Sequence, residues 1–222
     1  MSSSELTPAR IARIREVASR RQHDLTVFME RVHKPHNVAA IIRTCDAVGI
    51  ATTHAVPGDE GISRSNHIAQ GAQRWVHLNR HDNTTAGLSA LKAKGFALYA
   101  AHFDETAVDF RDIDFTQPSA IVLGTEKFGV SDEALELCDQ SIIIPMLGMT
   151  QSLNVSVATA VILYEAQRQR AQSGQYDNPD PRTTKLNETL ADAWIEREIA
   201  RRHRQPLPEI PDGSEAIEFT ER

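Results

Sequence analysis

The sequence has little cysteine and no long apolar run. Its 222 residues include two cysteines, Cys45 and Cys138, and both lie in apolar segments with helical spacing. We therefore expect them to be small core residues and not a disulfide or a pair of metal ligands. No window approaches the roughly 18 consecutive apolar residues of a membrane-spanning helix, and the start of the chain, M-S-S-S-E-L-T-P, lacks the hydrophobic core of a secretion signal. These absences predict a cytoplasmic protein with no membrane partner.

A nicotinamide-binding glycine fingerprint is also missing. The first expected strand, residues 25–32, is followed by H-K-P-H-N at 33–37 and not by G-x-G-x-x-G, which argues against a dehydrogenase. His33 and His36 lie three residues apart, but no third ligand is apparent, so no metal site is expected. No internal repeat or low-complexity block is present, and the length suits one domain with a core plus an extension.

The charge is distributed unevenly. The formal net charge is −6, which by itself disfavours a polyanionic partner. Residues 1–36 nevertheless carry seven Arg and Lys against four Asp and Glu, and residues 164–204 carry eight against seven. The acidic excess lies in residues 37–163 and in the tail from 205. Nucleic acid therefore remains a possible partner where the two basic ends of the chain converge, although a solvated helix face has a similar composition.

Apolar, β-branched segments alternate along the chain with segments of helical periodicity. This alternation predicts an α/β fold in which a mostly parallel sheet is flanked by helices on both faces, with further helices at both ends of the chain. The expected strands are 25–32, 51–56, 75–78, 96–103, 120–123 and 142–144, and the expected helices are 8–21, 37–48, 84–94, 131–138, 153–170 and 186–204.

Residues 141–170 organise the rest of the chain. The apolar triplet 142–144 is stopped by Pro145, which cannot donate to a sheet, and a loop with Gly148 leads into a long helix. Ser152 and Asn154 stand where that helix begins. Either side chain is suited to be a plain N-cap, but both also follow a buried strand, at the edge where open α/β sheets bind ligands.

Other segments carry local signals. Thr7 or Ser4 is suited to cap the first helix, and Asn37 to cap the helix that ends at Gly49. The acidic connection 104–116 is expected to pack its apolar side chains against the core. The polar loop 57–67 is expected to be irregular, and the acidic, proline-containing stretch 206–222 to be disordered. The three side chains expected to pack from the acidic connection are Val108, Phe110 and Phe115.

Three segments at strand ends have an informative order. They are N-V-A-A-I-I-R at 37–43, L-G-T-E-K-F-G at 123–129, and I-P-M-L-G-M-T-Q-S-L-N-V-S at 144–156. Together they resemble the motifs of the SPOUT superfamily, in particular the SpoU (TrmH) branch of RNA ribose 2′-O-methyltransferases. The resemblance covers about residues 25–170. It divides the chain into a basic N-terminal helix for RNA contact (1–24), a methyltransferase domain (25–173) and a C-terminal extension of one helix and an acidic tail (174–222).

The resemblance implies more than composition and spacing do. It implies a deep trefoil knot near the C-terminal end of the domain, S-adenosylmethionine as cofactor with S-adenosylhomocysteine as product, no metal, and a homodimer in which the arginine of one subunit lies near the cofactor of the other. V-H-K-P-H-N-V, A-V-D-F-R-D-I-D and the helix after Asn154 resemble members that methylate guanosine-18 of the tRNA D-loop. The alternatives are a 2′-O-methyltransferase for ribosomal RNA and a catalytically silent, knotted RNA-binding protein.

The motifs also assign site residues by resemblance. The implied catalytic residues are Asn37, Arg43, Glu126, Ser152 and Asn154. The implied cofactor-binding residues are Leu123, Gly124, Glu126, Gly129, Ile144, Met146 and Leu153. The candidates for phosphate contact are Arg10, Arg13, Arg20, Arg21, His36, Arg168 and Arg170.

The identity of the general base stays open. The family proposal makes Arg43 the base, with help from an RNA phosphate. A guanidinium normally stays protonated, with a pKa above about 12. Arg43 is equally suited to clamp a phosphate and stabilise the developing alkoxide, leaving the proton to a phosphate oxygen or water. Both roles predict that lysine cannot replace it.

Overall fold

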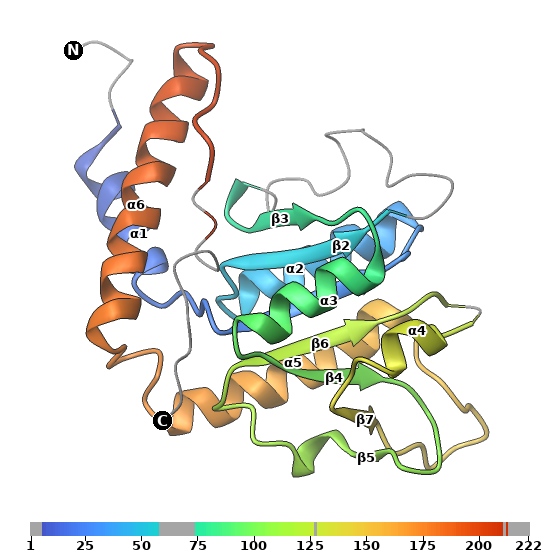
Figure 1. The fold of residues 1–222 in the computed structure, drawn as a ribbon. Coiled ribbons are helices and arrows are strands. Elements are labelled where there is room, and N and C mark those ends of the chain that lie inside the picture. The colour runs from blue at the N-terminus through green and yellow to red at the C-terminus, as the bar shows by residue number, and fades with distance from the viewer. Residues whose placement is uncertain (1–5, 58–73, 127, 211, 213–222) are drawn as a thin grey trace.

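The structure, a computed structural model, describes residues 6–57, 74–126, 128–210 and 212 (Figure 1). Seven strands form one sheet in the order β3-β2-β1-β6-β4-β7-β5, and every strand pair in it is parallel. This arrangement confirms the predicted α/β class. The strands are β1 (Leu25–Glu30), β2 (Thr52–Val56), β3 (His77–Arg80), β4 (Ala97–Ala101), β5 (Val108–Asp109), β6 (Ser119–Leu123) and β7 (Gln140–Ile143).

The centre of the sheet is covered on both faces. Every residue of β1, β2 and β6 is buried, which explains why β1 and β6 are mostly apolar in the sequence. Because successive side chains point to opposite faces, Val27 and Met29 join one core cluster and Phe28 joins the other. The two helix layers divide accordingly.

One layer consists of α2 (Pro35–Ala47) and α5 (Val155–Gln172), and the other of α3 (Thr84–Ala93) and the single turn α4 (Asp132–Leu135) (Figure 1). Ile41 and Ile162 bring α2 and α5 into the first cluster. Parallel strands require such crossover helices, so this layering follows from the alternation of elements along the chain. As predicted, Ser131 caps α4 by accepting a hydrogen bond from the Ala134 amide.

The two ends of the chain pack together beside the sheet. Helices α1 (Pro8–Ala18) and α6 (Pro181–Arg202) lie side by side in Figure 1 and share a third apolar cluster. Trp194 of α6 lies at its centre, in an edge-to-face contact with Trp75 at 5.1 Å between ring centroids. Thr7 caps α1, as one of the two predicted alternatives required.

Several predicted boundaries were wrong. The third strand begins at His77 and not at Trp75, because Trp75 turns into the cluster around Trp194. The acidic connection contains the short strand β5, which pairs with β7, while its Phe110 and Phe115 are buried as predicted. Helix α6 begins earlier than predicted, at Pro181, because Asp180 caps it and proline suits the first helical position.

The tail was predicted to be disordered, but its described part packs against the rest of the chain. Ile210 is buried in the third cluster, and the Arg197 guanidinium donates to the carbonyl of Pro208. Position 211 and residues 213–222 lie outside the described residues, as does the predicted irregular loop apart from Pro57.

Both cysteines are free thiols. Cys45 is fully buried in the core, as predicted, and burial raises its pKa well above the usual range. Cys138 is half-buried beside the second cluster, and burial raises its pKa to about 12. Among the described residues, no helix is long and apolar enough to cross a bilayer.

Candidate active site

Three loops meet at the carboxyl edge of the sheet. The Asn37 side-chain amide donates a hydrogen bond to the Glu126 carboxylate, and Lys34 forms an ion pair with the same carboxylate. The Asn154 amide donates to the side-chain oxygen of Asn37 at 3.3 Å. Asn37 therefore connects the loops after β6 and β7 through a single side chain.

Asn37 does not have the capping role that its position suggested. The N-cap of α2 is Lys34, which makes no side-chain capping bond, and Pro35 occupies the first turn. Asn37 lies in the first turn of the helix, three residues after the N-cap, and is only 2% exposed. Its amide group is therefore available for Glu126 and Asn154. Lys34 was not among the residues singled out from the sequence, although its place in H-K-P-H-N was a signal.

Asn154 has the N-cap role that its sequence position suggested, and its side chain also contacts Asn37. Its side-chain oxygen accepts from the Ser156 amide at 2.9 Å and from the Ser156 hydroxyl at 2.6 Å, which caps α5. Its amide group reaches Asn37. Ser152 lies two residues earlier on an exposed loop, and its hydroxyl makes no hydrogen bond within the part of the chain that the structure describes.

The loop that carries Glu126 is closed on itself. Thr125 and Gly129 exchange two backbone hydrogen bonds of 2.9 Å, and Gly129 has a φ of +71°, a conformation that glycine adopts without strain. Gly124 is packed tightly against this closure, since a Cβ added to it would lie 1.9 Å from the carbonyl oxygen of Gly129. The local backbone therefore favours glycine at both positions, at Gly124 because a Cβ would clash and at Gly129 because of its positive φ.

Gly124→Ala is expected to displace this loop. The added methyl group meets backbone and not a flexible side chain, so the substitution should lower the free energy of unfolding by about 1–3 kcal/mol. Gly148→Ala is the matched control, because a Cβ there would meet only the Thr150 amide nitrogen at 4.0 Å. Urea unfolding of both variants checks the prediction, and a Gly124→Ala protein as stable as the Gly148→Ala protein would contradict it.

The segment 144–153 leaves its backbone groups unpaired. Among the described residues, its amides and carbonyls make no hydrogen bond. Ile144 and Met146 are half-buried, whereas Leu147 and Met149 are fully exposed at the loop tip. Unpaired backbone donors and acceptors beside apolar side chains suit a ligand that combines a planar apolar ring with polar edges.

Arg43 lies apart from this cluster. It is exposed on α2, six residues beyond Asn37, and it makes no hydrogen bond or ion pair with any residue that the structure describes. The structure thus brings Asn37, Glu126 and Asn154 together but leaves the guanidinium free to meet another molecule.

Two of the predicted phosphate contacts are wrong. Arg21 is 1% exposed, and its guanidinium donates to the Ile50 carbonyl and pairs with Asp46. Burial lowers the pKa of Arg21, and the Asp46 carboxylate opposes that effect. Arg170 is 0% exposed and hydrogen-bonded within the core. Neither offers surface to an RNA. Helical spacing alone could not distinguish these two arginines from their exposed neighbours.

The remaining basic candidates are at the surface, with different partners. Arg10 pairs with Glu198 and lies over the Trp75 ring. Arg13 and Arg20 both reach Glu16, at 2.8 Å and 3.8 Å. His36 is exposed beside the Asn37 cluster, and Arg168 is exposed and bonded to Glu165.

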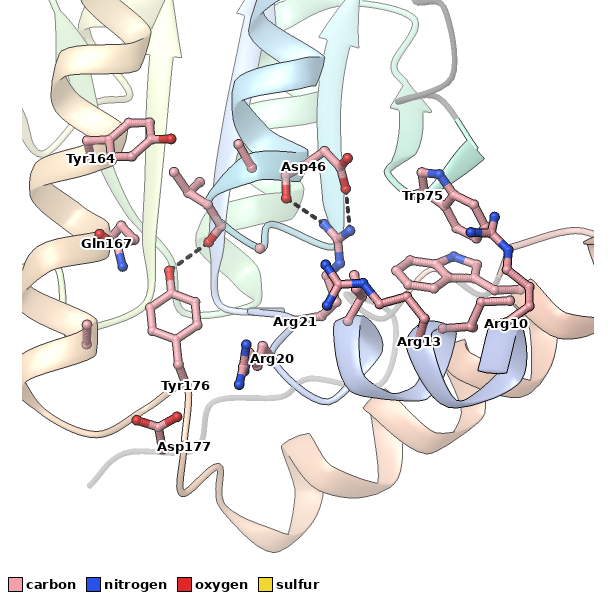
Figure 2. A pocket seen from close by; sticks show the side chains of 17 residues that line it. Arg10, Arg13, Arg20, Arg21, Asp46, Trp75, Tyr164, Gln167, Tyr176 and Asp177 are labelled. Carbon is pink, nitrogen blue, oxygen red and sulfur yellow. Dashed lines mark hydrogen bonds and ion pairs between the residues drawn. The ribbon is translucent and has the colours of Figure 1, made fainter. Parts of the chain in front are cut away.

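Three of these arginines line a groove of about 800 Å³. Figure 2 shows Arg10, Arg13 and Arg20 on one side of it, with Tyr164 of α5 and Tyr176 opposite. The groove lies toward the C-terminal half of α5, whereas Asn154 lies at the N-terminal end of that helix. It is therefore a second surface, distinct from the Asn37 cluster.

A family model described as "SpoU rRNA Methylase family" matches residues 24–164, which include all three loops of the cluster. The chain belongs to this SpoU family. Among SpoU relatives, the tRNA (guanosine(18)-2′-O)-methyltransferase of Thermus thermophilus is 52% identical over 193 residues, covering 87% of this chain and 99% of that protein. The Escherichia coli K12 enzyme of the same name is 53% identical over 171 residues, covering 77% and 75%.

Solved SpoU structures have the same fold. The A. aeolicus TrmH/SpoU tRNA modifying enzyme superposes with a TM-score of 0.77 at 41% identity, covering 86% of this chain and 96% of that one. The SpoU methyltransferase AviRb of Streptomyces viridochromogenes, solved in complex with AdoMet, superposes with a TM-score of 0.61 at 30% identity and covers 68% and 62%. The resemblance seen in the three motifs is thereby confirmed at the level of the family.

Proposed function

We propose that this SpoU-family chain is a tRNA (guanosine-18) 2′-O-methyltransferase that uses S-adenosylmethionine. The observation that supports it best is the hydrogen-bonded contact of Asn37, Glu126 and Asn154, in a chain half identical to enzymes of that name. The product is 2′-O-methylguanosine in the D-loop, with S-adenosylhomocysteine released.

The residues at the carboxyl edge fit the cofactor. The unpaired backbone groups of 144–153 would bind the polar edges of an adenine and the ribose, and apolar side chains would pack on the ring. Gly124 and Gly129 keep the neighbouring loop close to the sheet. The cofactor supplies an electrophilic methyl group on a sulfonium. The apolar side chains assigned to the pocket are Ile144, Met146 and Leu153, while Leu123, whose side chain is 1% exposed in the core, is assigned to it through its backbone.

The protein's contribution to catalysis is mainly orientation. Displacement at a methyl group needs the 2′-oxygen in line behind it, so fixed positions for both reactants supply much of the rate. Glu126 is held by Lys34 and Asn37, which fixes the direction of its oxygens. Ser152 and Asn154 would position the ribose at the start of α5. The free guanidinium of Arg43 would bind a phosphate and stabilise negative charge on the oxygen as its proton leaves.

We also propose that the enzyme is a homodimer in which Arg43 acts at the partner's site. Arg43 makes no hydrogen bond or ion pair with Asn37, Glu126, Asn154 or any other described residue. In addition, α5 turns an apolar stripe to solvent, with Val157 49%, Val161 37% and Tyr164 55% exposed. An apolar stripe on a helix that carries site residues supports a subunit interface.

Val157→Glu is expected to weaken that dimer at least about 30-fold, because a carboxylate would be buried without a partner. Sedimentation velocity over a range of protein concentrations measures the effect. Ala90→Glu places the same charge on an exposed position of α3 and should leave the dimer unchanged. A wild-type protein that sediments as a monomer at micromolar concentration would refute the homodimer itself.

Two further features belong to this proposal. One is a trefoil knot, which the resemblance of the three motifs to the SPOUT superfamily implies. The packed pair α1 and α6 forms an extension outside the sheet, and we assign RNA contact to its arginines at the groove. His36 and Arg168 are further exposed candidates for that contact.

The rival substrate is ribosomal RNA. It is favoured by one observation: a 23S rRNA (guanosine-2′-O-)-methyltransferase of Acinetobacter baylyi is 39% identical over 150 residues. Purified protein, labelled S-adenosylmethionine and equal amounts of tRNA transcript and a 23S rRNA fragment decide between the two substrates. We expect label in tRNA alone. Label in the rRNA fragment would identify ribosomal RNA as the substrate. Binding of both RNAs without label would favour the catalytically silent RNA-binding protein.

A further inference from the structure

The last residue of β1 is a buried carboxylate that the proposed chemistry does not use. Glu30 is 2% exposed and forms no ion pair with any residue that the structure describes. Its Oε1 accepts from the hydroxyls of Thr84 at 3.0 Å and Ser131 at 2.5 Å, and its Oε2 accepts from the Ser131 backbone amide at 2.9 Å. Three neutral donors from two other segments therefore converge on it.

The position of these donors relates Glu30 to the active site. Ser131 immediately follows the closed loop of residues 124–130, which carries Glu126. The entry of that loop is aligned with the neighbouring residue of β1, since Met29 pairs with Leu123. Two consecutive residues of β1 thus fix both ends of the loop, one through the sheet and the other through the Glu30 carboxylate.

Asn37, the other side of the site, is connected to Glu30 along the chain. The chain turns at Arg31, whose φ of +52° is uncommon for a residue with a side chain, and then enters α2 with Asn37 in its first turn. Glu30 is thus connected to Asn37 through the chain and to the Glu126 loop through hydrogen bonds to Ser131, and the two sides contact each other where Asn37 donates to Glu126. A shift of Ser131 relative to β1 would therefore change the relation between Glu126 and Asn37.

We propose that Glu30 is a positioning residue of the methyl-transfer site, whose buried carboxylate sets the place of the Glu126 loop relative to Asn37. An apolar side chain would fill the same volume without the cost of burying a charge, but only a carboxylate accepts all three hydrogen bonds without donating. Its contribution is thus the orientation of the loop. The inference rests on the proposed function, because it assigns Glu30 to a methyl-transfer site, but its test measures cofactor binding and does not require RNA.

Glu30→Gln keeps the shape of the side chain and removes one acceptor. Titration calorimetry with S-adenosylmethionine alone should show a loss of affinity of about tenfold, because the loop proposed to bind the cofactor is no longer fixed. Glu133→Gln is the matched control. Glu133 also links α4 to α3, through Thr85, but it does so at the surface and not at the loop. The Glu133→Gln protein should therefore bind S-adenosylmethionine with wild-type affinity.

A purely structural role predicts a different result. If Glu30→Gln lowers the melting temperature but keeps the cofactor affinity within twofold of the wild type, the inference is overturned. A double-mutant cycle with Glu126→Gln adds a second criterion, since Glu30 acting through that loop requires less than additive losses of affinity. Additive losses would equally overturn it.

Two smaller substitutions test the same carboxylate if Glu30→Gln does not fold. Ser131→Ala removes a donor on the loop side, and Thr84→Val removes a donor on the α3 side. Only Ser131→Ala should weaken cofactor binding, and equal effects would contradict the inference. Failure of the proposed function would appear separately, as wild-type protein that binds the cofactor but methylates no tRNA.

Discussion

Arg43→Ala is expected to lower the turnover of tRNA methylation by about 10²–10³-fold, the usual cost of removing one group that stabilises charge in the transition state. Arg43 is exposed and makes no hydrogen bond or ion pair with the residues that the structure describes, so the melting temperature should not change. Affinity for S-adenosylmethionine should also be retained, because the cofactor segment 144–153 lies on a different element.

Arg43→Lys keeps the positive charge but removes the planar, bidentate geometry of the guanidinium, so it tests the two separately. A lysine ammonium is a point charge that cannot bind phosphate oxygens in two parallel bonds, so this variant should be nearly as slow as Arg43→Ala. Arg111→Lys is the matched control, since Arg111 is exposed, pairs with Asp109 two residues earlier and lies over the Phe110 ring, away from the Asn37 cluster. Single-turnover kinetics measure the effect, and near-normal turnover by Arg43→Lys would defeat both proposed roles of the arginine.

Arg170→Ala should instead strongly lower the free energy of unfolding. The guanidinium is fully buried and donates to acceptors in two connecting segments, at 2.8 Å to the Phe115 carbonyl, 3.0 Å to the Gln117 carbonyl and 3.0 Å to the Gln22 side-chain oxygen. It also pairs with Asp24 just before β1. Removing it takes this donor from the partly exposed Asp24 carboxylate and from several carbonyls, and a loss of about 3–5 kcal/mol is typical when one partner of such a network is removed.

Arg168→Ala provides the comparison two residues earlier on the same helix. Arg168 is exposed and bonded to Glu165 of its own helix, so its loss should change the free energy of unfolding by less than about 0.5 kcal/mol. Urea unfolding followed by circular dichroism measures both variants. If Arg170→Ala were as stable as Arg168→Ala, the hydrogen bonds of Arg170 would not stabilise the packing of α5 against the segment before β1.

The contrast between these arginines shows what the sequence could predict. Strands β1 and β6 and the start of α5 were predictable because continuous apolar runs, Pro145 and the capping residue Asn154 are local signals. Burial of Arg170 depends on carbonyls contributed by residues that are distant in the sequence. No periodicity within α5 contains that information.

The apolar stripe of α5 shows a second limit. Val157 and Tyr164 indicated a helix, and the helix is present, but these side chains face solvent while Ile162 and Leu163 face the core. Helical spacing marks an apolar side without telling whether it packs on the same chain or on a partner. Similarly, Asn37 was predicted at the right helix end, but its partner Glu126 comes from a loop 89 residues away.

Mapping the methylated nucleotide tests the proposed reaction most directly. An unmodified tRNA transcript is incubated with the purified protein and S-adenosylmethionine, and the site of modification is read by alkaline hydrolysis, which does not cleave after a 2′-O-methylated ribose. We expect one resistant linkage, after guanosine-18, and none with Arg43→Ala. A methyl group on a base, a resistant linkage at another position, or an undiminished one with Arg43→Ala would contradict the proposed reaction or its key residue.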